Sequence, residues 1–113
     1  MPADKSDAAL LVQLAQWGTM MELDAAVAAI FADGFDSESA TTDDDVHVRT
    51  VLQFGETLGT LTKHGLLDTE LVADWLWVAG LWERVGPAAS KDRDKFGVPQ
   101  LYENMERLAS QPA

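Results

Sequence analysis

Apolar residues recur at helical spacing along this chain, and this periodicity constrains its fold more than any other feature. Leu71, Trp75, Val78, Trp82 and Val85 follow one another at the alternating spacings of a single helix face. No stretch alternates apolar and polar residues as a half-buried strand would. We therefore predict an all-α fold, an antiparallel bundle of five or six helices with no sheet. At 113 residues, the chain is expected to form a single helical domain over residues 1–113.

Capping patterns indicate where the first two helices begin and end. Ser6 or Asp7 can cap a first helix that runs to Trp17. The segment 19–22 has a hydroxyl followed three residues later by a carboxylate, the capping-box pattern that opens a second helix. Gly34 is expected to end that helix, because glycine readily adopts the left-handed conformation of a helix C-terminus.

The longest helix is expected after an acidic loop at about residues 34–42. It should span about residues 43–64, with Gly65 as its stop. Asp68 is then the N-cap of a fourth, strongly apolar helix. The dipeptide 86–87, Gly-Pro, is expected to break or kink that helix, because proline lacks an amide hydrogen and clashes with the preceding turn.

Charge excludes several classes of partner. The chain has 19 Asp and Glu against 8 Lys and Arg, a net charge of −11. Binding to a nucleic-acid backbone needs clustered cations, so we expect no nucleic acid as a partner. No apolar run approaches the roughly 20 residues that span a bilayer, and the sequence shows no signal peptide. We therefore expect no membrane partner and a cytoplasmic location, which the absence of cysteine fits.

Catalytic and metal-binding patterns are missing from the sequence. His47 and His64 lie 17 residues apart on one expected helix, roughly 25 Å, too far to share a site within one chain. The acidic stretch 33–45 lacks the residue order of an EF-hand. No nucleophile elbow, phosphate-binding loop or zinc spacing occurs. We expect no enzyme activity, no catalytic residue, no cofactor and no metal site.

Several short motifs lie in the second half of the chain. They are Val-Leu-Gln-Phe-Gly-Glu at 51–56, Gly-Leu-Leu-Asp at 65–68, Trp82, Arg93, Tyr-Glu-Asn-Met-Glu at 102–106, and Leu108. Over about residues 46–109 the chain resembles an uncharacterised bacterial family, domain of unknown function 4760. The resemblance implies the helical fold and assigns no activity. Family members often begin with a membrane-spanning helix, and no such helix is recognisable here.

Glu56 and Arg93 both belong to the motifs of this resemblance. It implies a structural ion pair between them, because a partly buried carboxylate needs a partner. The alternative places Glu56 on an exposed polar stripe that forms only weak surface ion pairs. On the same helix, Gly55 and Gly59 are spaced one turn apart, which predicts the close approach of another helix.

The tryptophans suggest two functions. Trp77 lies about 200° around a continuous helix from Trp75, so one neighbouring layer cannot cover both. The first hypothesis is a non-enzymatic helical interaction module that self-associates as a homodimer through Trp77 and Leu81, or that binds another protein. The second is a protein that binds a small apolar ligand in a pocket lined by Trp75 and Trp82. A central position of this helix would instead bury all four side chains.

Overall fold

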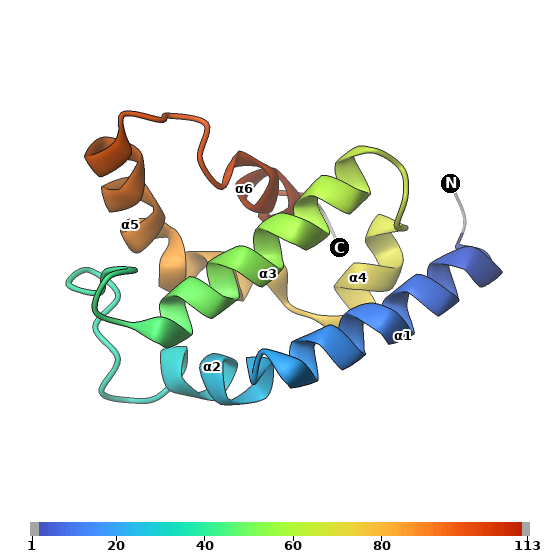
Figure 1. Ribbon diagram of the computed structural model, residues 1–113, viewed down its shortest axis with the longest axis horizontal. Coiled ribbons are helices and arrows are strands. Elements are labelled where there is room, and N and C mark those ends of the chain that lie inside the picture. Colours follow the sequence, from blue (N-terminus) through green and yellow to red (C-terminus); the bar gives the residue numbers. More distant parts are fainter. Residues whose placement is uncertain (1–2, 112–113) are drawn as a thin grey trace.

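The computed structural model describes residues 3–111, whose regular structure is entirely helical (Figure 1). Six helices occur there: α1 Lys5–Met20, α2 Leu23–Ile30, α3 Val46–Lys63, α4 Thr69–Trp75, α5 Val78–Phe96 and α6 Glu103–Ala109. No strand is found within this range, so the predicted all-α bundle is confirmed. The first two and last two residues of the expected domain lie outside the described part.

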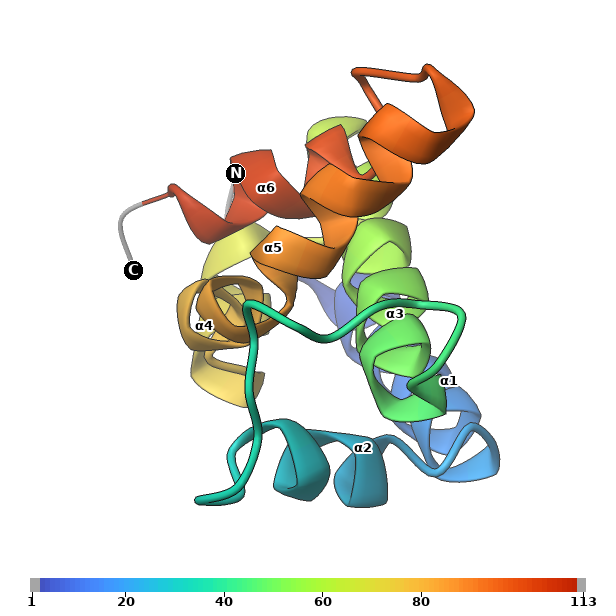
Figure 2. The ribbon, with the colours of Figure 1, turned by 90° about the vertical axis from the view of Figure 1, so that its left-hand side faces the viewer.

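Helix α3 passes through the middle of the molecule and packs mainly against α6, α2 and α5 (Figures 1 and 2). Its buried face is apolar, and Phe54 is its largest fully buried side chain. The Trp17 ring of α1 stacks on Phe54 at 5.0 Å, and the Trp75 ring of α4 meets Phe54 edge-on at 5.8 Å. All six helices contribute buried residues to one hydrophobic core.

Helix α1 differs from the sequence prediction at both ends. Its N-cap is Asp4, and the Asp4 and Asp7 side chains each accept a hydrogen bond from the other's backbone amide. The helix also continues through Gly18 to Met20, beyond its predicted end at Trp17. Gly18 is buried against Leu23 and Phe54, so its lack of a side chain permits helix packing and does not mark a helix end.

The predicted capping box at 19–22 does not form. The Thr19 hydroxyl donates to the Ala15 carbonyl inside α1, and Glu22 joins the two helices with a left-handed φ of 58° and no side-chain cap. Helix α2 ends at Ile30, before Gly34, and Gly34 is not in the left-handed region. Local hydrogen bonding within α1 therefore outcompetes the capping pattern.

The long helix α3 begins three residues later than predicted. Asp45 is its N-cap and accepts hydrogen bonds from the amides at 47 and 48, while Asp43 and Asp44 belong to the preceding loop. Its predicted stop is confirmed, since Gly65 has a φ of 70° just beyond the C-cap. Asp68 caps α4 as predicted, accepting from the Leu71 amide at 3.0 Å.

The structure has two helices, α4 and α5, where a single fourth helix was predicted. The break between them does not lie at the dipeptide 86–87, where it was predicted. Leu76 is extended and Trp77 is the N-cap of α5, so the helical conformation is interrupted after Trp75. Helix α5 continues through Pro87. Proline there removes the amide that would bond to the Glu83 carbonyl, but Glu83 is exposed and water can satisfy that carbonyl.

Within residues 3–111, no helix is long and apolar enough to cross a membrane.

Candidate functional site

An apolar groove of about 270 Å³ opens between α4, the start of α5 and the end of α6. Figure 2 shows these three elements gathered on one side of the molecule. None of the lining residues is charged, although the chain as a whole has a net charge of −11. We call this surface the groove face; it consists of Thr69, Val72, Ala73, Leu76, Trp77, Val78, Ala79, Leu108, Ala109 and Gln111.

Trp77 is the prominent side chain of the groove face, with 68% of its surface exposed. Its ring lies parallel to that of Phe31 at 6.1 Å, and the Arg84 guanidinium lies 5.4 Å from the Phe31 ring centre. Gly80 makes room for the indole, because a side chain at that position would collide with the ring. The ring is therefore held in place on one side while most of its surface stays open to solvent.

The structure separates the two residues that were expected to form an interface. Leu81 is only 6% exposed and belongs to the core of the single chain, whereas Trp77 is exposed. The break at Leu76 places Leu81 one turn into α5 with its side chain facing inward. Leu81 is therefore removed from the candidate interface, and Trp77 remains.

The groove is not lined by the two tryptophans that were expected to line an apolar pocket. Trp75 and Trp82 are half-buried side chains packed against the core, and neither lines the groove. Trp75 packs on Phe54, and the Trp82 ring lies 5.7 Å beneath the Arg93 guanidinium. The tryptophan that borders the hollow is Trp77. The residues missed from the sequence are small ones, such as Ala73 and Ala79, whose spacing shows only that helices run there.

Helix α6 forms one side of the groove and is held to α3 by Glu56. The two Glu56 carboxylate oxygens accept hydrogen bonds from the Met105 amide and the Asn104 side-chain amide, each at 2.9 Å. Tyr102, the N-cap residue of α6, provides no side-chain cap of its own. Glu56 therefore caps α6 from a different helix, where a negative charge also meets the positive end of the helix dipole.

The glycines of α3 form the seat for α6, as their spacing predicted. A side chain at Gly59 would overlap the Asn104 backbone, and one at Gly55 would overlap the Met105 side chain. The Arg107 guanidinium donates to the Gly59 carbonyl at 3.1 Å. Backbone therefore packs directly against backbone here, which fixes the position of a helix too short to be stable alone.

The predicted ion pair between Glu56 and Arg93 is replaced by two separate contacts with the α6 segment. Arg93 pairs with Glu106 at 2.9 Å and donates from Nε to the Leu101 carbonyl at 2.7 Å. Glu56 binds the start of α6, as described above. The motif residues Glu56 and Arg93 thus do not contact each other. Each of them contacts the α6 segment instead.

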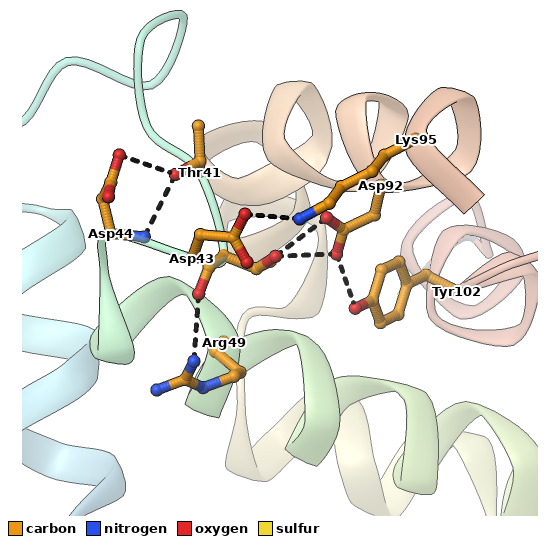
Figure 3. Close-up of polar contacts among 8 residues, drawn as sticks. Thr41, Asp43, Asp44, Arg49, Asp92, Lys95 and Tyr102 are labelled. Carbon is orange, nitrogen blue, oxygen red and sulfur yellow. Dashed lines mark hydrogen bonds and ion pairs between the residues drawn. The ribbon is translucent and has the colours of Figure 1, made fainter.

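A buried carboxylate on α5 holds both the acidic loop and α6. Asp92 is 5% exposed, and its oxygens accept from the Thr42 hydroxyl at 2.8 and 3.0 Å and from the Tyr102 hydroxyl at 2.9 Å (Figure 3). Burial and the hydrogen bond to the Asp92 carboxylate raise the pKa of Tyr102 to about 12. The sequence marked Tyr102 as a motif residue but gave no indication that Asp92 is buried.

Two lysines of α5 hold the same loop. Lys91 donates to the backbone carbonyls at 38 and 40, and Lys95 pairs with Asp43. The acidic loop therefore lies against α5 and is not simply surrounded by solvent.

His47 lies in the first turn of α3 and His64 is its C-cap. In the described part of the chain, no three His, Asp or Glu side chains are grouped as a metal site requires.

Comparison with known proteins gives one match. The model of a family described as "Domain of unknown function (DUF4760)" matches residues 5–111. The match confirms the resemblance seen at about residues 46–109 and extends it over α1 and α2. No curated protein and no solved structure matches the chain.

Proposed function

This chain belongs to the DUF4760 family, and we propose that it acts as a helical interaction module that self-associates through its groove face. The observation that carries the proposal is Trp77, a tryptophan 68% exposed at the edge of an uncharged groove. Exposed aromatic side chains beside an apolar hollow are typical of protein–protein interfaces. A second copy of the chain would remove this surface from water.

The charge distribution supports the groove face as the contact. Two copies that each carry a net charge of −11 repel each other over most of their surfaces. The ten residues of the groove face carry no charge, so a contact between two such faces brings no like charges together among these residues. Interface centres are likewise depleted in charged residues and enriched in aromatic ones.

Three ionisable residues around α6, of which Glu56 and Arg93 are motif residues, support a non-enzymatic role. Glu56, Asp92 and Arg93 are each engaged in hydrogen bonds that hold α6 in place. A catalytic acid, base or nucleophile has to be directed at a substrate, whereas these groups are directed at the protein backbone and at neighbouring side chains. Their combined effect is to position α6, and with it one side of the groove.

Sedimentation equilibrium at micromolar concentration tests the proposal. The wild-type chain should have twice the 12.3 kDa chain mass, and Trp77→Ser should shift it towards the monomer. Phe96→Ser is the matched control, because Phe96 is a 60% exposed aromatic residue at the opposite end of α5. A wild-type monomer contradicts the proposal, and so does equal dissociation of both variants.

A second candidate function is the binding of a small apolar ligand in the same groove. It is favoured by the volume of about 270 Å³ and by the apolar lining, close to the lower limit of known ligand pockets. Native mass spectrometry of protein isolated from its own cell distinguishes the two. A retained small molecule on a single chain supports the ligand, and a doubled mass without one supports self-association.

A further inference from the structure

We propose that the connection between α2 and α3 is a strap that opens from α5 as one unit while the helices stay folded. The strap consists of residues 32–44 and includes the acidic loop. Figure 2 shows it rising from the end of α2, passing beside α5 and returning to the start of α3. Its latch is the contact between Thr42 and Asp92 in the second half of α5. The proposal therefore does not depend on self-association through the groove face.

The strap is tied to the helices by side chains. Within the described part of the chain, each of its backbone-to-backbone hydrogen bonds joins residues three or four positions apart. Such local bonds do not reach α5 and can persist when the strap moves. The contacts with α5 and α3 are those of Lys91 with the carbonyls at 38 and 40, Lys95 with Asp43, Asp92 with Thr42, and Arg49 with the Thr42 carbonyl.

The strap contributes little to the hydrophobic core. Of residues 32–44, which the structure describes throughout, only Thr42 is buried. Phe35 and Ala40 are half-buried and pack against the core. Segments with few buried apolar contacts open at a lower free energy than the whole fold unfolds. The strap is therefore held closed mainly by its polar contacts, and the buried one among them involves Thr42.

The Asp92 carboxylate makes Thr42 a latch that can be released. Asp92 accepts from the Thr42 hydroxyl at 2.8 and 3.0 Å and from the Tyr102 hydroxyl at 2.9 Å (Figure 3). When the strap opens, Asp92 keeps the Tyr102 bond and water replaces Thr42, so the carboxylate still has donors. Opening also frees the ammonium groups of Lys91 and Lys95. The strap thereby controls access to a polar surface of α5.

Cleavage by a glutamate-specific endoprotease in native buffer reports the open strap. Glu38 is the one glutamate in the strap, and its carbonyl accepts from Lys91 in the closed state. The rate of cleavage at a transiently opened segment follows the population of the open form. Peptide masses identify the cut after Glu38.

Three substitutions in the strap test the latch. Thr42→Val should speed the cut after Glu38 about 10- to 100-fold, as expected when a buried carboxylate loses a donor. Thr42→Ser keeps a hydroxyl and should be cut at nearly the wild-type rate. Thr41→Val is the matched control, because the Thr41 hydroxyl bonds to Asp44 within the strap. If Thr42→Val is cut no faster than Thr41→Val, the latch is wrong.

Glu56→Ala distinguishes opening of the strap from unfolding of the whole protein. The Glu56 carboxylate bonds to Asn104 and Met105 at the start of α6, so its loss should destabilise the fold in urea and leave the cut after Glu38 at the wild-type rate. If Glu56→Ala speeds that cut as much as Thr42→Val does, the strap opens only when the protein unfolds, and the proposal is wrong. Circular dichroism checks that each variant is folded.

Discussion

The Glu56 carboxylate on α3 accepts a hydrogen bond from the Met105 amide at 2.9 Å and so caps a helix 49 residues further along the chain. The contact explains why a glutamate and a Tyr-Glu-Asn-Met-Glu segment occur together in the motifs of this chain. It also helps to position one side of the groove, since Leu108 and Ala109 of the same helix line the groove.

Loss of the Glu56 carboxylate should destabilise the fold. Glu56→Ala leaves the Met105 amide and the Asn104 side chain without their acceptor, which we expect to lower the free energy of unfolding by about 1 to 3 kcal/mol. Urea denaturation followed by circular dichroism measures the change. Gln53→Ala is the control, because Gln53 is an exposed residue one turn away on α3. Equal losses in both variants would show that the capping contact contributes nothing.

Gly59→Ala should destabilise the α3–α6 contact more than Gly55→Ala does. A methyl group at Gly59 meets the Asn104 backbone, which cannot move aside, whereas one at Gly55 meets the flexible Met105 side chain. We expect a loss of about 1 to 3 kcal/mol for Gly59→Ala, partly offset by the better helix propensity of alanine. Thermal melts compare the two. Gly34→Ala provides the control, because its added methyl group has nothing within 4 Å.

Much of the fold was predictable because local rules determine it. Gly65 and Asp68 mark a helix stop and a helix start through their own backbone and side chain, and both predictions were confirmed. The break after Trp75 was not predictable, since no glycine or proline lies there and tertiary packing decides it. At Pro87 a break or kink was predicted and the helix continues instead. The solvent-exposed position of Glu83 permits this.

The candidate site was predicted only in part, for a similar reason. The self-association hypothesis required an exposed Trp77, whereas a central helix would have buried it, and Trp77 is exposed although the helix breaks just before it. Leu81 could not be distinguished from Trp77 by spacing alone. The link between Glu56 and Arg93 was expected as a direct ion pair, but the residues meet through α6, whose position depends on contacts between distant segments.

Tyr102 should titrate well above its ordinary pKa of 10. It is the only tyrosine in the chain, so its ultraviolet absorbance can be followed directly. The pKa in the folded protein is raised to about 12, so the folded state keeps a proton that the unfolded state loses. The contribution of Tyr102 to stability should therefore be constant below about pH 10 and fall between about pH 10 and 12.

The Tyr102 titration in native buffer and in urea checks this shift. The native midpoint should be the higher of the two, and coincident midpoints would contradict the hydrogen bond to Asp92. Tyr102→Phe removes that bond, so its stability should lack the alkaline decline that Tyr102 produces in the wild type.

Self-association should strengthen as salt is added. Chains with a net charge of −11 repel each other, and raising the ionic strength from about 0.01 to 0.15 M shortens the screening length from about 30 to 8 Å. The groove face has no charges whose attraction the salt could weaken. Sedimentation equilibrium at the two ionic strengths measures the association constant. A decrease with salt would indicate a contact made by opposite charges, outside the groove face.

The most direct test of the groove face as the contact is cross-linking through a single introduced cysteine, since the chain has none of its own. Ala79→Cys places a thiol on the groove face, and Gln100→Cys places one on the exposed link between α5 and α6. With a short bismaleimide at micromolar protein, Ala79→Cys should give a covalent dimer in high yield and Gln100→Cys should not. Equal yields from the two positions, or a dimer from Gln100→Cys alone, would contradict self-association through the groove face.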